Sequence, residues 1–398
     1  MPYIDAIVDC PVFDSFRVQQ VGGMFDVPIG QRAAARFTAE LPGLDEGWQI
    51  GVIVGPSGSG KSTVARQAYG AELSQRRDWP RDRAVVDCFG ELPIKEITGL
   101  LTAVGFSSPP AWIKPYHVLS NGEQFRCDLA KSLADAIDRT HCWTSQQWHP
   151  SGNQSVGIPP NDGQSAIADQ HLPLVAFDEF TCVVDRNVAR AASAAIAKGI
   201  RGGWIAARFV AVTCHGDVLP WLEPDWILDM ATARLDRRRL WRPEIELRVF
   251  RCRHAAWSLF ARHHYLNGAL SRSARCFVAL WEDRPVAFCA TLPIIGRRKH
   301  WRITRVVCLP DYQGLGIGMR LAEAVAALHR QDGNRVNVTA SHPALIAHCV
   351  RSRYWRTVGV SRAGSSRRAK FVHNYRHRGA RTVASFEYIG QGAGARGQ

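Results

Sequence analysis

The chain has no long hydrophobic run and no regular cysteine spacing. No apolar stretch reaches the ~18–20 residues that a membrane-spanning helix requires. The first residues, MPYIDA, lack the basic start and apolar stretch of a signal peptide. The eleven cysteines include no C-x-x-C pair, which indicates reduced thiols rather than a disulfide framework. We therefore expect a cytoplasmic protein that has no membrane span of its own.

Acidic residues are scarce in the C-terminal part of the chain. Residues 231–398 hold 31 Lys and Arg against 9 Asp and Glu, a net charge of +22. Residues 1–230 hold 19 against 26, a net charge of −7. A surplus of positive charge can be a solvated surface, but one of this size favours a polyanionic partner such as DNA or RNA. The length of 398 residues indicates two or three domains.

One glycine-rich segment carries a specific chemistry. Residues 55–63, GPSGSGKST, fit the phosphate-binding pattern G-x-x-x-x-G-K-[ST] and follow the apolar run Ile50–Val54. This order predicts a buried strand, a turn that exposes backbone N–H groups, and a helix over residues 61–70. Lys61 reaches the outer phosphates and Ser62 offers an oxygen to Mg²⁺. The expected ATP-binding residues of this loop are Gly55, Ser57, Gly58, Ser59, Gly60, Lys61, Ser62 and Thr63.

The rest of the first 230 residues alternates apolar strands with amphipathic helices, which predicts a mainly parallel α/β sheet. Strands are expected at residues 84–87, 172–177, 209–213 and 226–230, and helices at 94–104, 120–136 and 188–199. Residues 140–170 are rich in Gln, Ser, Gly, Asn, Asp and Pro and predict a flexible insertion. We interpret residues 1–230 as one domain and the basic, proline-containing residues 231–245 as a linker.

Further motifs follow the phosphate loop in a recognisable order. Residues 119–133, LSNGEQFRCDLAKSL, look like the signature of ABC-type ATPases and its helix. Residues 172–179, LPLVAFDE, look like the Walker B strand, and residues 182–185, CVVD, like the D-loop. His215 stands where the switch histidine would be. Residues 20–230 therefore resemble an ABC-type ATPase.

This resemblance implies a catalytic set. Asp178 would hold Mg²⁺ together with Ser62, and Glu179 would orient or deprotonate the attacking water. Lys61 and His215 would complete the set, although His215 could also be an ordinary loop histidine.

The resemblance also implies a shared site. Ser120, Gly122 and Asp185 of one subunit would complete the ATP site of another, which implies a homodimer. Phe25 could stack on adenine or lie in the core.

Two departures from the family pattern concern transport. Only about 60 residues separate Lys61 from Ser120, and no glutamine for a Q-loop follows Asp87. Both departures remove parts that the family uses for transport coupling. A transporter ATPase subunit with an accessory domain is therefore the alternative function and not the leading one.

A second glycine motif lies in the basic part of the chain. Residues 305–318, RVVCLPDYQGLGIG, contain the pattern Q/R-x-x-G-x-G/A between a valine-rich strand and a helix. A hairpin is expected at 275–292, a strand at 303–309, a helix at 319–330, a strand at 336–340 and a helix at 343–353. Residues 250–375 thus resemble the GNAT acetyltransferase family, which implies acetyl-CoA as cofactor. The residues implied to bind it are Val306, Val307, Gln313, Gly314, Leu315, Gly316, Ile317 and Gly318.

The acyl-transfer residues are less defined. Tyr354 is the candidate that protonates the departing CoA thiolate, and it could equally be a core aromatic. The general base stays open among His263, His264, Glu323, Ser341 and His342.

The sequence therefore predicts an α/β protein with an N-terminal P-loop ABC-type ATPase domain and a C-terminal α+β GNAT domain at residues 246–380, followed by a tail at 381–398. This fusion resembles a little-characterised microbial and phage family, and its GNAT part is faintly similar to the phage Mom protein, which modifies adenine in DNA. We expect an ATP-dependent acyltransferase that acts on nucleic acid. A GNAT fold that serves only as a sensor or docking module is the non-catalytic alternative.

Overall fold

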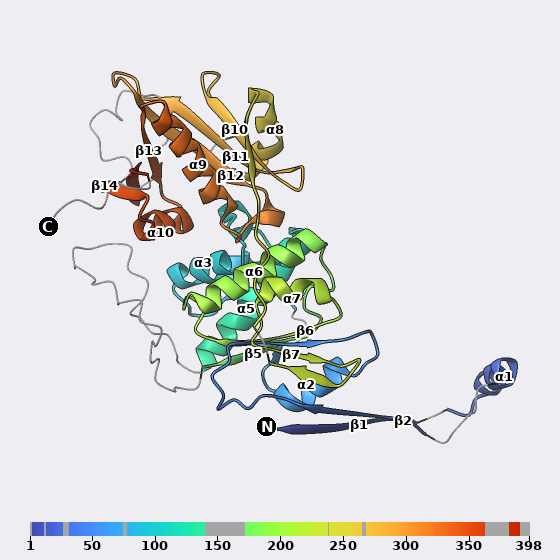
Figure 1. Ribbon diagram of the computed structural model, residues 1–398. Coiled ribbons are helices and arrows are strands. Elements are labelled where there is room, and N and C mark those ends of the chain that lie inside the picture. Colours follow the sequence, from blue (N-terminus) through green and yellow to red (C-terminus); the bar gives the residue numbers. More distant parts are fainter. Residues whose placement is uncertain are drawn as a thin grey trace.

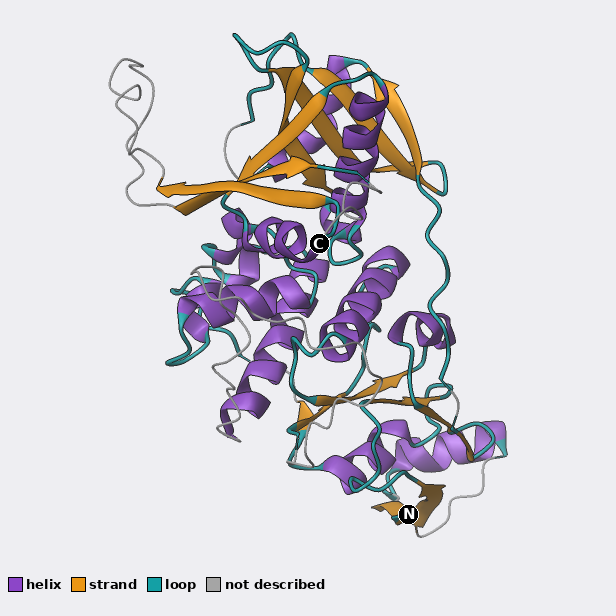
Figure 2. Ribbon diagram, turned by 60° about the vertical axis from the view of Figure 1, so that its left-hand side comes forward, coloured by secondary structure: helices purple, strands orange, loops and turns teal. Residues whose placement is uncertain are grey.

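Two β-sheets lie at opposite ends of the structure, with helices between them (Figures 1 and 2). The computed structural model describes residues 2–11, 13–26, 32–74, 78–139, 172–237, 239–264, 268–362 and 382–390. The predicted insertion at 140–170 lies outside the described residues. We call the described residues up to 237 the first domain and those from 239 onward the second domain.

A six-stranded sheet organises the first domain. Its order is β4 (Leu73–Ser74), β5 (Leu174–Phe177), β6 (Arg208–Thr213), β3 (Ile50–Val54), β7 (Trp226–Asp229) and β8 (Arg234–Asp236). All neighbours are parallel except β8, which runs antiparallel to β7. The apolar runs in β3, β5 and β6 are almost fully buried, as expected of central parallel strands. The strands predicted near 50, 172, 209 and 226 are confirmed.

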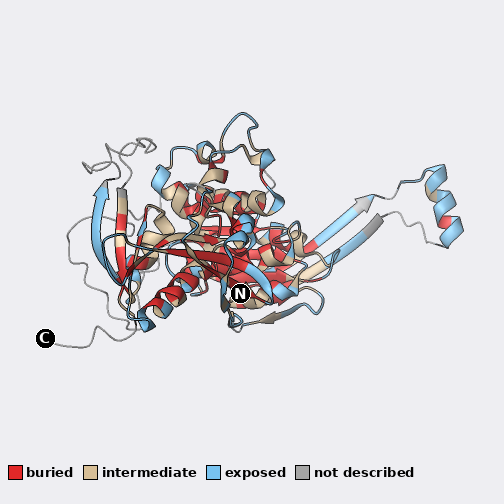
Figure 3. Cartoon of the chain, turned by 90° about the horizontal axis from the view of Figure 1, so that it is seen from above, coloured by how far each residue is buried: buried red, intermediate tan, exposed pale blue. Residues whose placement is uncertain are grey.

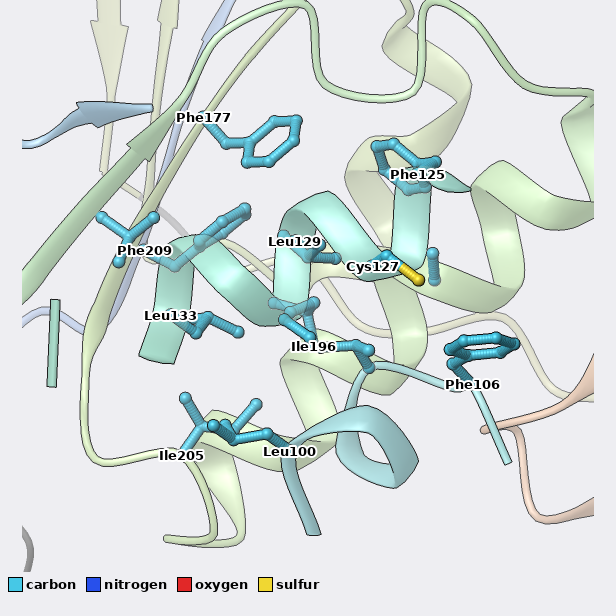
Figure 4. Close-up of a cluster of buried hydrophobic side chains, with 14 of the residues drawn as sticks. Leu100, Phe106, Phe125, Cys127, Leu129, Leu133, Phe177, Ile196, Ile205 and Phe209 are labelled. Carbon is cyan, nitrogen blue, oxygen red and sulfur yellow. The ribbon is translucent and has the colours of Figure 1, made fainter. Parts of the chain in front are cut away.

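The helices of this domain pack around its sheet. They are α2 (Lys61–Tyr69), α3 (Ile94–Ala103), α4 (Pro109–Trp112), α5 (Asn121–Arg139), α6 (Arg186–Arg201) and α7 (Leu219–Leu222). Figure 4 shows apolar side chains of α3, α5 and α6 meeting those of β5 and β6, among them Leu129, Ile196 and Phe209. The helices predicted at 94–104, 120–136 and 188–199 are thus confirmed.

Three boundaries differ from the prediction. Residues 84–87 are not a strand, because Val85–Cys88 forms a 3₁₀ turn whose Val85 amide donates to the Lys114 carbonyl. The predicted linker begins inside the first sheet, since Leu235 of β8 pairs with Leu228. The predicted tail contains β15 (Thr382–Tyr388), whose Phe386 is fully buried. Sequence pattern alone missed β8 and β15 because each is stabilised by pairing with a distant or preceding strand.

The N-terminal residues form an arm that extends from the body (Figures 1 and 3). Strands β1 (Tyr3–Pro11) and β2 (Arg32–Glu40) pair antiparallel, and α1 (Phe16–Phe25) lies at the far end of this hairpin. Phe25 is 68% exposed. The candidate for adenine stacking therefore lies on the arm and not in the core.

A seven-stranded sheet organises the second domain. Its order is β14 (Trp355–Arg362), β15, β13 (Arg335–Ala340), β12 (His300–Cys308), β11 (Arg284–Pro293), β10 (Arg275–Trp281) and β9 (Arg248–Cys252). The helices are α8 (Trp257–Phe260), α9 (Ile317–Gln331) and α10 (Pro343–Arg351). Strands β12 and β13 are parallel and pair over only four residues each, from His300 to Ile303 and from Arg335 to Val338. Beyond Ile303 they separate. The predicted hairpin, strands and helices of this region are confirmed.

Candidate functional site

Three candidate motifs lie at one edge of the first sheet. The phosphate loop follows β3, Asp178 and Glu179 follow β5, and His215 follows β6. Strand β6 lies between β5 and β3, and all three are parallel. Because carboxyl ends of parallel strands meet at the same edge of a sheet, residues from distant parts of the sequence come together here.

The phosphate loop needs its glycines for two reasons. Gly58 and Gly60 have φ values of 79° and 83°, in the left-handed region. A methyl group at Gly60 would lie 2.3 Å from the Phe37 ring. Lys61 donates from Nζ to the Pro56 carbonyl at 2.6 Å, and the buried Ser59 Oγ has no hydrogen-bond partner among the described residues. A turn with free polar groups before the N-terminus of α2 fits a phosphate group.

The two predicted Mg²⁺ ligands are adjacent. Ser62 Oγ donates to Asp178 Oδ1 at 3.0 Å, and the Glu179 amide donates to the same oxygen at 2.9 Å. A hydroxyl and a carboxylate at this separation form a set of oxygen donors of the kind that Mg²⁺ uses beside a nucleotide phosphate. Glu179 has a φ of 52°, and its side chain is exposed beside Asp178. The carboxylate is thus open to water.

The signature and D-loop residues have structural contacts of their own. Ser120 and Glu123 form a capping box at the start of α5, in which the Ser120 amide donates to Glu123 Oε2 at 3.0 Å. Asp185 caps α6 by accepting from the Asn187 and Val188 amides. A methyl group at Gly122 would lie 3.1 Å from a Val188 methyl. The N-terminal ends of α5 and α6 are therefore packed closely against each other.

The predicted acyl-CoA loop, residues 313–318, packs against the first domain. Gly314 has a φ of 93°, and a methyl group there would lie 2.7 Å from Ala195 Cβ and 3.0 Å from Gly105 Cα. Gln313 Oε1 accepts from the Ser107 amide at 3.0 Å. The loop thus touches both α6 and the turn after α3.

The remaining predicted acyl-CoA residues lie around this loop. Leu315 and Ile317 are buried in the core of the second domain, as is Val307 on β12. A methyl group at Gly318 would lie 3.5 Å from a Val306 methyl. The start of α9 therefore rests directly on β12, at the point where β12 and β13 separate.

Positive charge gathers at the start of α9. Lys198 Nζ of α6 lies 3.7 Å from the position that a methyl group on Gly316 would take. Lys198 is exposed along part of its side chain, but desolvation of its ammonium lowers its pKa, and Arg242, Arg351 and Arg320 lower the pKa further. A cation this close to a helix N-terminus forms an environment suited to the pyrophosphate of a CoA ester.

A buried arginine of the first domain lies within electrostatic reach of the second domain. Arg126 of α5 is 1% exposed, and its Nε and Nη2 have no hydrogen-bond partner among the described residues. Burial lowers its pKa, whereas the charge of Asp311, in the turn before the acyl-CoA loop, raises it. The charge of Asp311 in the second domain thus acts on the guanidinium of α5.

His342 of the second domain also contacts the first domain, at Ser107. Its Nε2 lies 3.3 Å from the Ser107 carbonyl, and its Nδ1 accepts from the Ala344 amide at the start of α10. These partners assign the proton to Nε2 and require a neutral ring. Burial lowers the pKa of His342. His342 is therefore a residue of the domain contact, and Ser107 is held by the second domain on both sides.

This contact makes stability dependent on pH. The folded-state pKa of His342 is below its ordinary value of 6.5, so the unfolded chain binds more protons as the pH falls through that value. We expect the contribution of His342 to be complete above pH 6.5 and to be lost as the pH falls toward its folded-state pKa. Melting temperatures at pH 7.5 and 5.5 should differ less in His342→Asn than in the wild type. His117→Asn, at an exposed histidine of the first domain, should keep the wild-type difference; an unchanged slope in His342→Asn would contradict the assignment.

The candidate acyl-transfer residues do not form one cluster. Tyr354 lies in the turn after α10 rather than on the helix, where its hydroxyl accepts from Arg353 at 3.3 Å. Glu323 of α9 is buried and accepts from His348 at 2.7 Å. Burial by itself would raise the Glu323 pKa, but the hydrogen bond and charge of His348 bring it below the ordinary value. Glu323 is therefore held as an ionised acceptor inside the domain.

The two adjacent histidines have separate surroundings. His263 Nε2 accepts from Arg262 at 3.0 Å, and burial lowers the His263 pKa. The His264 ring lies edge-on to Trp257 at 5.9 Å. Ser341 is half-buried. None of these contacts selects one residue as the general base.

Sequence reasoning missed the residues of the domain contact. Gly105, Ser107, Ala195 and Lys198 lie in the first domain and meet Gln313, Gly314 and Gly316 of the second. A glycine after a helix is an ordinary C-terminal cap, and an alanine-rich helix is ordinary core, so neither carries a local signal.

Elsewhere a cavity of about 140 Å³ lies beside Arg275 and His329, and its volume is below that of typical ligand pockets.

Comparisons with known proteins give one family match and several similar solved structures. The acetyltransferase (GNAT) family model matches residues 238–348. An IAA acetyltransferase from Bacillus cereus is 15% identical, with 36% of this chain and 99% of that chain covered and a TM-score of 0.28. A GNAT family acetyltransferase from Elizabethkingia anophelis, solved with acetyl-CoA bound, is 10% identical, with 36% and 97% covered and a TM-score of 0.28.

The first domain has similar solved structures of another kind. A dimeric bacterial ABC transporter cassette is 13% identical, with 52% of this chain and 93% of that chain covered and a TM-score of 0.35. The search of curated proteins finds no match. The described residues include no helix that is long and apolar enough to cross a membrane.

The protein therefore has a mixed α/β architecture, and its residues 238–348 match the GNAT acetyltransferase family model.

Proposed function

We propose that this protein hydrolyses ATP in its first domain and transfers an acyl group from CoA in its second. The observation that carries this proposal is the packing of the acyl-CoA loop on α6, the helix that begins at the D-loop residue Asp185. The acyl-CoA loop thereby contacts the helix that begins at the proposed D-loop.

The residues of the first site support ATP hydrolysis as follows. The phosphate loop and Lys61 would hold the phosphates, and Ser62 and Asp178 would hold Mg²⁺. Bound Mg²⁺ supplies charge neutralisation at the phosphates. Glu179 is exposed next to Asp178 and would orient the water or accept its proton, and His215 follows the neighbouring strand β6.

The second site would hold the CoA ester at the start of α9. The N–H groups of residues 313–318 and the cations near Gly316 would bind the pyrophosphate, and Val306 and Val307 line the strand beside it. Tyr354 would donate a proton to the leaving thiolate. Its hydroxyl already has a cationic neighbour in Arg353, which holds the ring in place.

Helix α6 would couple the two sites. Asp185 caps its first turn, and Ala195 contacts Gly314 about 15 Å further along at 1.5 Å per residue. A movement of the D-loop in response to ATP would move α6 as a unit. The packing of Ala195 against the acyl-CoA loop would then change. We propose that the functional ATPase is a homodimer, because Ser120 and Gly122 would complete the site of a second subunit.

The acceptor that we propose is nucleic acid or a protein bound to it. The support is the net charge of +22 over residues 231–398. On the β11–β12 connection, Arg297 and Arg298 are both exposed and have no ion pair among the described residues. They are well placed to contact phosphates.

Salt dependence tests this electrostatic part. The logarithm of the association constant for duplex DNA should fall linearly with the logarithm of salt concentration, with a slope of about −0.9 per phosphate contact. Replacing Arg297 and Arg298 with Gln should reduce the slope by about 1–2. The same change at the exposed Arg81 and Arg83 of the first domain is the matched control. Negligible binding to DNA and RNA at low salt would exclude the nucleic-acid role.

The proposed ATPase and acyltransferase activities are tested first with purified protein and then in cells. ATP turnover and release of free CoA are measured with nucleic acid, protein and small amines as acceptors. Mass spectrometry of nucleic acid and protein from cells with and without the active protein then identifies the acceptor. Binding of acetyl-CoA without CoA release on any acceptor would favour a sensor or docking module instead.

A further inference from the structure

Two cysteines lie beside the candidate switch histidine. Cys182 lies in the turn after β5, and Cys214 and His215 directly follow the neighbouring strand β6. The Sγ atoms of Cys182 and Cys214 are 3.6 Å apart. One ligand atom from each of the three residues lies within 4.8 Å of the others. The sequence gives no C-x-x-C signal, because the two cysteines are far apart in the chain and meet only through the pairing of β5 with β6.

These separations match those of a metal centre. In a tetrahedral zinc site with Zn–S bonds of about 2.3 Å and a Zn–N bond of about 2.0 Å, two sulfurs lie about 3.8 Å apart and a sulfur and a nitrogen about 3.5 Å apart. The observed sulfur pair already has nearly this spacing, and a nitrogen of His215 lies within 4.8 Å of both sulfurs. Cys214 is exposed, and Cys182 and His215 are half-buried, so an ion can enter from solvent.

We propose that Cys182, Cys214 and His215 bind a thiophilic divalent cation, Zn²⁺ being the physiological one, with water in the fourth position. Both thiols lose their protons to solvent when the metal binds, and the imidazole coordinates as the neutral ring, so no oxidant or reductant is needed. Two thiolates balance the charge of the ion. The ligands are soft, in contrast to the oxygen pair of Ser62 and Asp178 that suits Mg²⁺.

The site has a consequence for ATP turnover, which rests on the proposed function of the first domain. A metal bound to His215 occupies the imidazole that would otherwise face the nucleotide phosphate. It also joins the turn after β5 to the turn after β6. Zn²⁺ therefore inhibits ATP hydrolysis from a site next to the catalytic Glu179, without competing for the Mg²⁺ ligands.

The binding test uses the full chain in metal-free buffer with its thiols reduced. Titration with Co²⁺ should give stoichiometric binding with a thiolate-to-cobalt charge-transfer absorption, and Zn²⁺ should displace the Co²⁺. Cys182→Ser and Cys214→Ser should each weaken binding by at least about 100-fold, because removal of a ligand costs more than loss of a supporting hydrogen bond. Cys88→Ser is the matched control, since Cys88 is also a half-buried free thiol of the first domain. Equal Co²⁺ binding by wild type and by the Cys182→Ser/Cys214→Ser double variant would overturn the proposal.

Two other readouts separate the alternatives. If mild disulfide oxidants consume both thiols and the reduced protein binds no Co²⁺, the pair is a redox pair and the metal site is wrong. ATP turnover is then measured with and without Zn²⁺. Inhibition that Cys182→Ser removes supports the regulatory role, whereas metal binding without inhibition contradicts that role and leaves the site in place. A protein that binds Co²⁺ but never hydrolyses ATP contradicts the proposed function and not the site.

Discussion

Replacing Glu179 with Gln should lower ATP turnover by about 10²–10⁴-fold, the range by which a positioned general base accelerates a reaction. The substitution preserves shape and removes only the charge and the proton-accepting capacity. Glu179 follows β5 directly, its side chain is exposed, and the adjacent Asp178 is hydrogen-bonded to Ser62. ATP binding should therefore persist, and the variant should accumulate as an ATP-bound dimer in size-exclusion chromatography.

The matched control is Glu91→Gln, at an exposed glutamate of the same domain. It should leave turnover unchanged. Full turnover in Glu179→Gln would move the catalytic base elsewhere and undermine the assignment of Asp178 and Glu179 as the Walker B pair. Loss of turnover without a trapped dimer would keep the base and contradict the shared site.

Replacing Gly314 with Ala should separate the acyl-CoA loop from the first domain. The new methyl group would lie 2.7 Å from Ala195 Cβ and 3.0 Å from Gly105 Cα, in a backbone conformation with a φ of 93°. The left-handed conformation costs about 1–2 kcal/mol for a residue with a side chain. Overpacking adds about 1–3 kcal/mol. We expect a lower melting temperature, at least about tenfold weaker acetyl-CoA binding, and loss of any effect of ATP on CoA release.

The control for this prediction is Gly296→Ala. Gly296 also has a positive φ, of 79°, but a methyl group there would meet no atom within 4 Å. The control therefore carries the backbone cost without the steric one and should keep acetyl-CoA binding and the response to ATP. If the two variants show the same acetyl-CoA binding and the same response to ATP, the acyl-CoA loop does not pack against α6 in solution.

The two glycine loops illustrate how far local sequence can predict structure. Each loop lies between a strand and a helix that directly adjoin it in sequence. The residues that make the turn therefore also define its chemistry. Gly58 and Gly60 in the first loop, and Gly314 and Gly316 in the second, all have positive φ values as such turns require. The strands that precede both loops were predicted from apolar runs, and both are confirmed.

Other features could not be predicted, because they depend on partners far away in the chain. The strand at 382–388 was expected to be tail, since its order depends on pairing with β13 and β14. Residues 84–87 have an apolar run typical of a strand but find no strand to pair with. His342 was a candidate base, and its burial against Ser107 follows from the docking of two domains.

The sequence by itself determined that this protein carries two glycine loops of different chemistry, an acidic pair after a buried strand, and a strongly basic second domain. These are properties of contiguous residues and of composition. Only the tertiary structure decided that the second loop rests on α6 and that Cys182 and Cys214 meet beside His215. The physical reason is that both depend on packing between segments that are distant in sequence, through parallel strand pairing in one case and glycine-to-alanine contact across a domain interface in the other.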